Sequence, residues 1–239
     1  MTTTNVENKI ALVTGGSSGI GLAIIQKLLQ NNIAVIAHFN RHKPDLTHER
    51  LKWIKADFSI VAEINGMINQ IIKDNKRIDY LVNVASVSED KNFSEINIQD
   101  IQYIYQTNLF SHITITNEIF SLMKENGYGR IVTVSSIGVK FAGSANTMLY
   151  SSSKCALEAV TRSFAKLGAQ WNILANSVRA GVTDTGFHKD ESKNMVKRIS
   201  MIPLKRMAKP VEIADMIYFL LDSTGDFITG QEFSVSGGE

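Results

Sequence analysis

The chain has 239 residues and a formal net charge of +2, with 44% apolar and 20% charged residues. These values are typical of one soluble α/β domain, and the small net charge gives no electrostatic reason to expect nucleic acid or an anionic membrane as a partner. The single cysteine, Cys155, excludes an internal disulfide, and no N-terminal stretch has the pattern of a signal peptide, so we expect a cytoplasmic protein.

The beginning of the chain has the pattern of a strand, a glycine-rich turn and a helix. An apolar run at 9–13 leads directly into Thr14-Gly15-Gly16-Ser17-Ser18-Gly19-Ile20-Gly21, and apolar residues then recur at helical spacing. Glycines let a backbone approach a pyrophosphate closely, and the N-terminus of the following helix attracts that anion. This order predicts a dinucleotide-binding site, with a plain tight turn as the alternative.

The spacing Thr14-Gly15-x-x-x-Gly19-x-Gly21 resembles the cofactor-binding segment of the classical short-chain dehydrogenases/reductases. The resemblance extends over nearly the whole chain. It implies one domain over residues 1–239, built as a Rossmann-type, doubly wound parallel sheet of seven strands. It also implies an active site at the carboxyl ends of the strands.

The second predicted strand, 33–39, ends at Asn40-Arg41 without an acidic residue. In the family an acid at this position accepts hydrogen bonds from the ribose of NAD and repels a 2′-phosphate. A guanidinium can pair with that phosphate, so Arg41 favours NADP(H) over NAD(H). The alternative is that Arg41 is a solvated loop charge. Many NADP-using relatives place a basic residue where this chain has Ser18.

The connection between the second and third strands is predicted to be short. Only residues 42–52 separate Arg41 from the next strand, 53–56, so at most a turn of helix fits around 47–51. We therefore expect the adenine end of the cofactor to be less covered than in relatives. Asp57 follows this strand, and the resemblance implies that it touches the adenine amino group. Ser59 is a predicted N-cap of the next helix.

The fourth predicted strand, 77–82, leads into Asn83-Val84-Ala85-Ser86, where the family pattern is Asn-Asn-Ala-Gly. Asn83 and Ala85 keep that pattern, while Ser86 adds bulk where glycine usually lies beside the cofactor. A long helix is then predicted from a cap at Asn97 to about Met123.

Near the middle of that helix, Thr107-Asn108-Leu109 resembles the family segment that carries a catalytic asparagine. Asparagine is a poor residue for a helix interior. The resemblance implies a helix irregularity at this point and a water anchored by Asn108 behind the catalytic lysine. The alternative is an ordinary polar residue on an exposed face.

Tyr150 and Lys154 are four residues apart, so on a helix both side chains leave the same face. A nearby ammonium lowers the pKa of a tyrosine from its usual value of about 10, which makes the phenol a general acid or base near neutral pH. Ser136 follows the fifth predicted strand, 130–134, and can hold a carbonyl oxygen against Tyr150. The spacing leaves Ser135 as an alternative hydroxyl, and a chance surface pair is the alternative to the catalytic interpretation.

After the sixth predicted strand, 173–178, the run from Ala180 to Thr185 resembles the family pattern Pro-Gly-x-x-x-Thr, with Ala180 in place of proline. The resemblance implies that Gly181 lets the nicotinamide approach and that Thr185 binds its carboxamide. It also implies a substrate lid over about 186–209. Pro210 is expected at the first turn of the helix that follows.

The resemblance thus implies a catalytic set and a cofactor-binding set. The catalytic set is Asn108, Ser136, Tyr150 and Lys154, and the sequence assigns no metal site. The cofactor set is Thr14, Gly15, Ser17, Gly19, Ile20, Gly21, Asn40, Arg41, Asp57, Asn83, Ala85, Tyr150, Lys154, Gly181, Thr183 and Thr185.

The implied reaction is reversible hydride transfer between NADP(H) and a carbonyl or alcohol. The whole chain is similar to 3-oxoacyl-carrier-protein reductases, and also to sugar, steroid and polyol dehydrogenases. An acyl carrier protein is therefore a candidate partner. Arg130 is a candidate contact for it, with a structural role as the alternative. A homotetramer built on the helices at 97–123 and 150–170 is expected. The alternatives are a non-catalytic cofactor-binding relative and an enoyl-thioester reductase, although enoyl reductases space tyrosine and lysine more widely.

Overall fold

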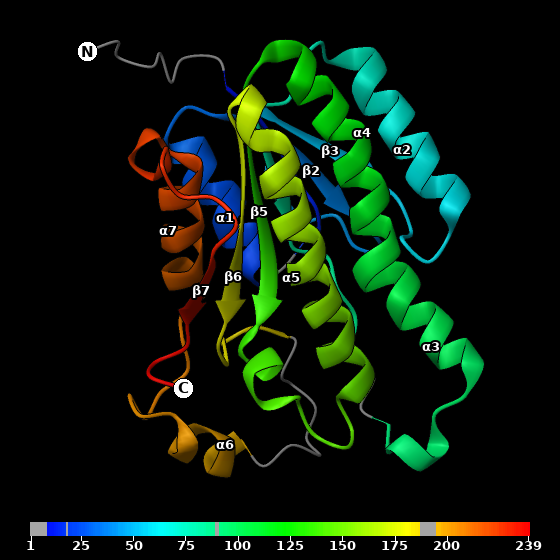
Figure 1. Ribbon diagram of the computed structural model, residues 1–239, viewed down its shortest axis with the longest axis vertical. Coiled ribbons are helices and arrows are strands. Elements are labelled where there is room, and N and C mark those ends of the chain that lie inside the picture. The colour runs from blue at the N-terminus through cyan, green and yellow to red at the C-terminus, as the bar shows by residue number, and fades with distance from the viewer. Residues whose placement is uncertain (1–8, 18, 89–90, 187–194) are drawn as a thin grey trace.

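The computed structural model describes residues 9–17, 19–88, 91–186 and 195–239 (Figure 1). Seven strands form one sheet in the order β3-β2-β1-β4-β5-β6-β7, and all of their pairings are parallel. The strands are β1 (Ile10–Val13), β2 (Ala34–Phe39), β3 (Leu51–Lys55), β4 (Tyr80–Asn83), β5 (Gly129–Ser136), β6 (Ile173–Ala180) and β7 (Glu232–Val235). The predicted doubly wound, seven-stranded sheet is confirmed.

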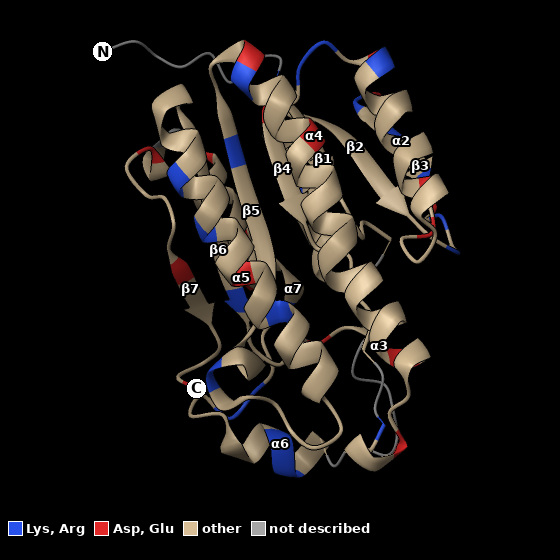
Figure 2. Cartoon of the chain, turned by 45° about the vertical axis from the view of Figure 1, so that its right-hand side comes forward, with Lys and Arg blue, Asp and Glu red and all other residues tan. Residues whose placement is uncertain are grey.

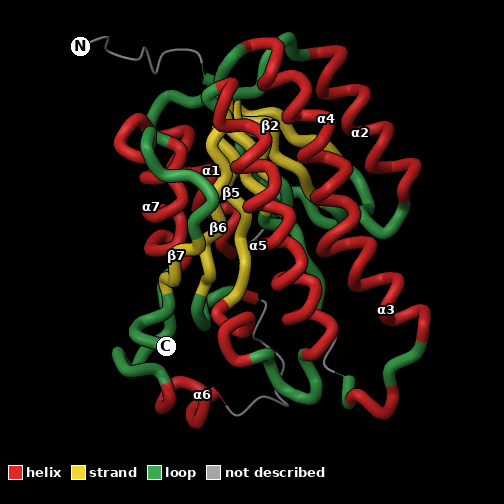
Figure 3. Tube along the Cα trace, in the orientation of Figure 1, coloured by secondary structure: helices red, strands yellow, loops and turns green. Residues whose placement is uncertain are grey.

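Two layers of helices cover the sheet (Figures 1 and 3). On one face α1 (Gly19–Gln30) and α7 (Pro210–Leu221) pack on the strands, with Pro210 at the first turn of α7 as predicted. On the other face lie α2 (Val61–Asp74), α4 (Ser111–Asn126) and α5 (Met148–Gly168). Alternate residues of a strand belong to the two cores: Ala11 and Val13 face one layer and Leu12 the other.

The predicted long helix is present, but it is interrupted. It starts as α3 (Ile98–Tyr105), passes through a π-helical turn (Gln106–Phe110) and continues as α4. Asn97 caps it as predicted, because its side chain accepts from the Asp100 N–H while the Asp100 carboxylate accepts from the Asn97 N–H. The expected irregularity around Asn108 is therefore confirmed.

The connection between β2 and β3 is short, as predicted, and residues 40–50 contain no helix. The Trp53 indole holds this connection by donating to Leu46 O at 3.1 Å. Two local predictions need correction. Strand β3 begins at Leu51, two residues earlier than predicted. Ser59 does not cap α2, which begins at Val61. The Ser59 hydroxyl instead donates to Asp57 Oδ1 at 2.6 Å, since a carboxylate two residues away is a strong, local acceptor.

Helix α6 (Met195–Met201) lies beyond the carboxyl ends of the strands (Figure 1). Of the predicted lid, 186–209, residues 187–194 lie outside the described residues. Near the end of this region the backbone of Ala208 pairs with the segment that follows β6, because Ala208 N donates to Val182 O at 2.9 Å. Among the helices that the structure describes, none is both long and apolar enough to cross a bilayer.

Candidate active site

A cavity of about 1460 Å³ opens at the carboxyl ends of the strands. Its walls come from the glycine turn before α1, the ends of β2, β4, β5 and β6, the first turns of α5, and α6. Ligand sites in doubly wound sheets form at this edge, where the strand order reverses, here between β1 and β4. The volume is sufficient for a dinucleotide together with a small substrate.

The glycine turn leaves no room for side chains. A Cβ at Gly15, whose φ is +65°, would lie 2.7 Å from the backbone of Ala85, and one at Gly21 would lie 2.1 Å from Gly15 O. Gly19 has φ +54° and starts α1, with Thr185 packed against it. Bare backbone and a helix N-terminus without an acidic residue in its first turn therefore face the cavity, which fits a bound pyrophosphate.

His38 supports this turn, and sequence reasoning missed it. Its Nδ1 accepts from Gly15 N at 3.0 Å, its Nε2 donates to Ala56 O at 2.9 Å, and its ring stacks on Phe58 at 4.0 Å. Burial lowers the pKa of His38 to about 4, so the ring is neutral and can accept. The sequence feature that could have identified His38 is a histidine inside an otherwise apolar strand.

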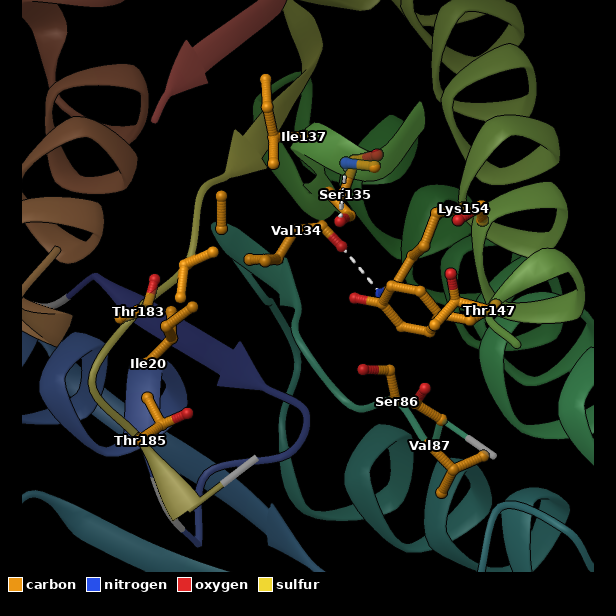
Figure 4. A pocket seen from close by; sticks show the side chains of 18 of the residues that line it. Ile20, Ser86, Val87, Val134, Ser135, Ile137, Thr147, Lys154, Thr183 and Thr185 are labelled. Carbon is orange, nitrogen blue, oxygen red and sulfur yellow. Dashed lines mark hydrogen bonds between the residues drawn. The ribbon is translucent and has the colours of Figure 1, made fainter. Parts of the chain in front are cut away.

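Tyr150 and Lys154 leave the same side of α5, as predicted, and both line the cavity. The Lys154 Nζ lies 5.8 Å from the centre of the Tyr150 ring and donates to Val134 O at 2.9 Å (Figure 4). The lysine is 1% exposed, and burial lowers its pKa to about 8. Helix α5 therefore brings a phenol and an ammonium of reduced pKa to one wall.

The acidity of Tyr150 differs from the expectation. Burial raises the pKa of its phenol, while hydrogen bonds with the hydroxyls of Ser136 and Ser86 lower it. The Lys154 ammonium donates to Val134 O, and its expected effect on the acidity of Tyr150 stays a prediction. Ser86, which the sequence suggested only as added bulk, is thus a second hydroxyl on the reacting side of the tyrosine.

The structure distinguishes the two candidate serines after β5. Ser135 is 2% exposed, and its hydroxyl donates to Glu158 Oε1 at 2.6 Å. Glu158 is in turn held by both Nε and a terminal nitrogen of Arg179, at 2.8 and 2.7 Å. Ser136 bonds Tyr150 and accepts from Gly138 N at 3.1 Å. Ser136 is therefore the hydroxyl that faces the phenol.

Asn108 is fully buried in the π-helical turn, so it is not an exposed surface residue. Its amide clamps the backbone of Val87, accepting from Val87 N and donating to Val87 O, both at 2.8 Å, and it also donates to Ser153 Oγ at 3.2 Å. Its side chain does not line the cavity. It holds the segment that carries Ser86 against α5.

The predicted cofactor residues divide into two groups. Those that line the cavity are Gly15, Ser17, Gly19, Ile20, Asn40, Asp57, Ala85, Tyr150, Lys154, Gly181, Thr183 and Thr185. Those that do not are Thr14, Gly21, Arg41 and Asn83. In Figure 4, Ile20, Thr183 and Thr185 lie on one side of the cavity, and Ser86 and Lys154 on the other.

Thr14 and Asn83 shape the wall instead of lining it. The Thr14 hydroxyl accepts from Val84 N at 2.9 Å and from Ala85 N at 3.2 Å. The Asn83 amide contacts the buried ring of His112, whose Nε2 lies 2.7 Å from Ala85 O. Burial lowers the pKa of His112 to about 3. Together these groups fix the backbone of Ala85 beside the glycine turn.

Asn40 and Asp57, which the resemblance places at the adenosine of the cofactor, both line the cavity. The pKa of Asp57 is lowered first by its bond from the Ser59 hydroxyl, and further by Asn40 and by the charge of Arg41. Arg41 is exposed and lies at the rim of the cavity, outside its lining. Ser18, where relatives carry a basic residue, lies outside the described residues.

Gly181 and Arg130 also have structural explanations. A Cβ at Gly181 would lie 2.6 Å from Ser236 Cα, so close packing of β6 on the end of β7 already requires glycine there. Arg130 is 1% exposed, and its guanidinium bonds Asp226 at 2.6 Å and Asn172 O at 2.8 Å. Of the two roles expected for Arg130, this burial and these bonds favour the structural one over a contact with a carrier protein. Within the described residues no group of side chains is arranged to hold a metal ion.

Comparisons with known proteins agree with this site. The family described as "short chain dehydrogenase" matches residues 9–196. The chain is 33% identical to an acetoacetyl-CoA reductase of an Acinetobacter species over 97% of this chain and 98% of that one, and 30% identical to 3-oxoacyl-[acyl-carrier-protein] reductase FabG of Aquifex aeolicus over 98% of both. Among solved structures it is similar to an ElxO variant with NADPH bound, with a TM-score of 0.87, 26% identity and coverage of 96% and 97%.

Proposed function

Because this chain belongs to the short-chain dehydrogenase/reductase family of oxidoreductases, we propose that it transfers hydride reversibly between NADP(H) and a carbonyl or alcohol substrate. The observation that carries the proposal is the meeting of Ser136, Tyr150 and Lys154 in the cavity that the glycine turn also lines. A bound nicotinamide dinucleotide would supply or accept the hydride, and the protein handles the proton and the charge.

Tyr150 gives a proton to the substrate oxygen in reduction and removes it in oxidation. Ser136, already bonded to the phenol, positions that oxygen and stabilises the negative charge that develops on it. Lys154, with a pKa lowered to about 8, holds a ribose hydroxyl of the cofactor and supports the phenolate once the site is filled. Asn108 acts by fixing the segment around Val87.

The preference for NADP(H) is supported by the absence of an acid at the end of β2 and by the charge of Arg41 at the cavity rim. The NADPH in the similar ElxO structure agrees with it. The glycine turn, Asn40 and Asp57 are proposed to hold the pyrophosphate and the adenosine, with Gly181, Thr183 and Thr185 at the nicotinamide.

For the substrate, the names of the two curated relatives favour a 3-oxoacyl thioester, carried on coenzyme A or on an acyl carrier protein. We further propose a cytoplasmic homotetramer, by analogy with the family, and a substrate lid formed by 186–209. Mass measurement in solution tests the homotetramer, and limited proteolysis with and without cofactor tests the lid.

The reaction is tested by following NADPH oxidation with acetoacetyl-CoA and with neutral ketones. Tyr150→Phe should reduce turnover by at least about a thousandfold while leaving NADPH binding close to that of the wild type, since the phenol proton is lost and the cavity keeps its shape. If Tyr150→Phe kept most of the activity, the assignment would be wrong. NADPH binding with no turnover of any carbonyl by the wild type would instead indicate a non-catalytic relative.

A further inference from the structure

The substrate end of the cavity contains three charged side chains that the proposed reaction does not use. Lys140 belongs to the 3₁₀-helical segment Ile137–Phe141 that directly follows Ser136. Arg198 is on α6, which Figure 2 shows to carry basic residues, and Glu239 follows β7. All three line the cavity, and they come from parts of the chain that are far apart in sequence.

These three residues are bonded to one another, because Glu239 contacts Arg198 through its carboxylate and Lys140 through its main-chain oxygen. The Arg198 guanidinium bonds Glu239 Oε1, and Lys140 Nζ donates to the main-chain oxygen of Glu239 at 3.0 Å. The Glu239 side chain is 7% exposed, compared with 32% for that of Arg198. Gly237 and Gly238, with φ of +68° and +101°, make the turns that bring Glu239 to this place.

The pairing of Glu239 is incomplete. Its second carboxylate oxygen, Oε2, is buried and has no hydrogen-bond partner among the described residues. A buried oxygen of an anion without a donor is destabilising, and Arg198 can bind both oxygens of a better-placed carboxylate or phosphate at once. An anion that pairs both of its oxygens with Arg198 can therefore displace the Glu239 carboxylate, of which only one oxygen is paired.

Apolar side chains adjoin the two cations. Phe141 follows Lys140 and is 57% exposed, and Met201 lies one turn after Arg198 and is 64% exposed; both line the cavity. A ligand that reaches from Ser136 to this end of the cavity would therefore meet both apolar surface and positive charge. The arrangement matches a molecule with a carbonyl, an apolar chain and a terminal anion.

We propose that Arg198, with Lys140 beside it, forms a subsite for an anionic group of the substrate, and that the Glu239 side chain occupies the position at Arg198 until that group displaces it. The inference rests on the proposed hydride transfer. Among carbonyl substrates it favours those that carry a carboxylate or phosphate on an apolar chain over the thioesters that the names of the relatives suggest. Arg198 binds the anion through its fork and Lys140 adds a second charge. Glu239 sets how tightly such anions are held, because it competes with them.

The test uses a homologous series of methyl ketones ending in a carboxylate, each measured beside its own methyl ester, and ketones of the same lengths ending in a phosphate. The readout is the ratio of kcat/KM for the anionic ketone to that for the ester. At the matching chain length the wild type should prefer the anion, and the favoured member of the carboxylate and phosphate arms identifies the anionic group.

Arg198→Gln should lower this ratio about tenfold or more, because a charge-assisted bond is lost. Glu239→Gln should raise it several-fold, because the competing charge is removed while the shape is kept. Lys197→Gln is the matched control: this lysine is the exposed neighbour of Arg198 and does not line the cavity, so the ratio should stay that of the wild type.

A second measurement does not depend on turnover. With NADPH present, the melting temperature of the wild type should rise on addition of a simple alkanoate of the matching length, and that of Arg198→Gln should not. Turnover of the esters with a ratio unchanged in both Arg198→Gln and Glu239→Gln would overturn the subsite and leave the proposed function intact. No turnover of any of these ketones, nor of acetoacetyl-CoA, by the wild type would overturn the proposed function, and the alkanoate shift would then decide the subsite alone.

Discussion

The pKa of the partly buried Tyr150 phenol is subject to opposing effects. Burial raises its pKa, and the hydroxyls of Ser136 and Ser86 lower it by stabilising the phenolate. Ser86 comes from the end of β4 and Ser136 from the end of β5, so the two hydroxyls reach the phenol from neighbouring strands. The proton affinity of Tyr150 therefore depends on the register of the sheet as well as on α5.

We predict that Ser86→Ala shifts the pH dependence of alcohol oxidation to higher pH. Removing a hydrogen bond to the phenolate raises the pKa of Tyr150, so a higher pH is needed to form the base, while the rate at the high-pH plateau changes little. Initial rates of oxidation between pH 6 and 10 test this. Ser88→Ala is the control, because Ser88 lines the same cavity, whereas the hydroxyls that lower the pKa of Tyr150 are those of Ser136 and Ser86. Identical profiles for Ser86→Ala and the wild type would contradict the prediction.

His38 links stability to pH. Its pKa is about 4 in the folded protein and about 6.5 in an unfolded chain, so between these values the unfolded chain binds more protons and stability falls as pH falls. At pH 5 this amounts to about 2 kcal/mol relative to pH 7. His38→Asn keeps an acceptor for Gly15 N but does not titrate. The stability that this variant loses between pH 7 and pH 5 should therefore be smaller by this amount. Urea unfolding at both pH values measures the difference, and an equal loss in the two proteins would refute it.

At the scale of elements, a buried ion pair joins α5 to the end of β6. Glu158 lies one turn after Lys154 and is 2% exposed, and Arg179 holds both of its carboxylate oxygens. Ser135 on β5 donates to the same carboxylate. The pair thus fixes the start of the segment Ala180–Thr185, where this chain lacks the proline of its relatives.

Arg179→Met should destabilise the fold by about 3–5 kcal/mol, because it leaves the Glu158 carboxylate buried without a counter-charge. The double variant Arg179→Met, Glu158→Leu should recover most of that loss, since an apolar pair of similar volume can replace a buried ion pair. Asp215→Asn is the comparison, because its pair with Lys27 is exposed and should matter by less than about 1 kcal/mol. The free energy of unfolding in urea separates the three variants.

Glycines in two helices should respond in opposite ways. Nothing lies within 4 Å of a Cβ at Gly66 in α2, so Gly66→Ala should stabilise the protein by about 0.5–1 kcal/mol through helix propensity. A Cβ at Gly21 in α1 would lie 2.1 Å from Gly15 O, so Gly21→Ala should displace the glycine turn and weaken NADPH binding. Thermal melting and cofactor titration test the pair. Equal effects of the two substitutions would contradict it.

The elements that could be predicted from sequence are those whose signals are local. The cap at Asn97, Pro210 at the start of α7 and the tyrosine–lysine spacing on α5 each depend on residues within one turn. The prediction for Ser59 failed because a capping residue and a partner for the carboxylate at Asp57 look alike in sequence. The contacts of His38 and Arg130 depend on residues 18 to 96 positions away, which no local pattern contains.

At the scale of the whole molecule, the cavity gathers side chains from most of the chain, and their order along it was predictable. Of the sixteen cofactor residues that the family resemblance predicted, twelve line the cavity, whereas Thr14, Gly21, Arg41 and Asn83 do not. The sequence could not distinguish residues that line the cavity from residues that support the lining, because both occur in the same short motifs.

Cofactor binding should stabilise the whole molecule. At a concentration of NADPH about 100 times its Kd, the free energy of unfolding should rise by about 2.7 kcal/mol, and an equal concentration of NADH should give a smaller rise. Arg41→Gln should reduce the NADPH effect and leave the NADH effect unchanged, since only NADPH has the 2′-phosphate. Lys43→Gln, an exposed neighbour, is the control. A larger shift with NADH than with NADPH would refute the use of Arg41.

The position of β1 also has a consequence for the order in which the protein can be made. This strand pairs with β2 on one side and with β4 on the other, and β4 comes some seventy residues later. While the ribosome is still synthesising that interval, the inner edge of β1 has no neighbour and its backbone groups are open to pairing with other nascent chains. The emergence of Tyr80–Asn83 closes that edge and ends the most vulnerable stage of synthesis.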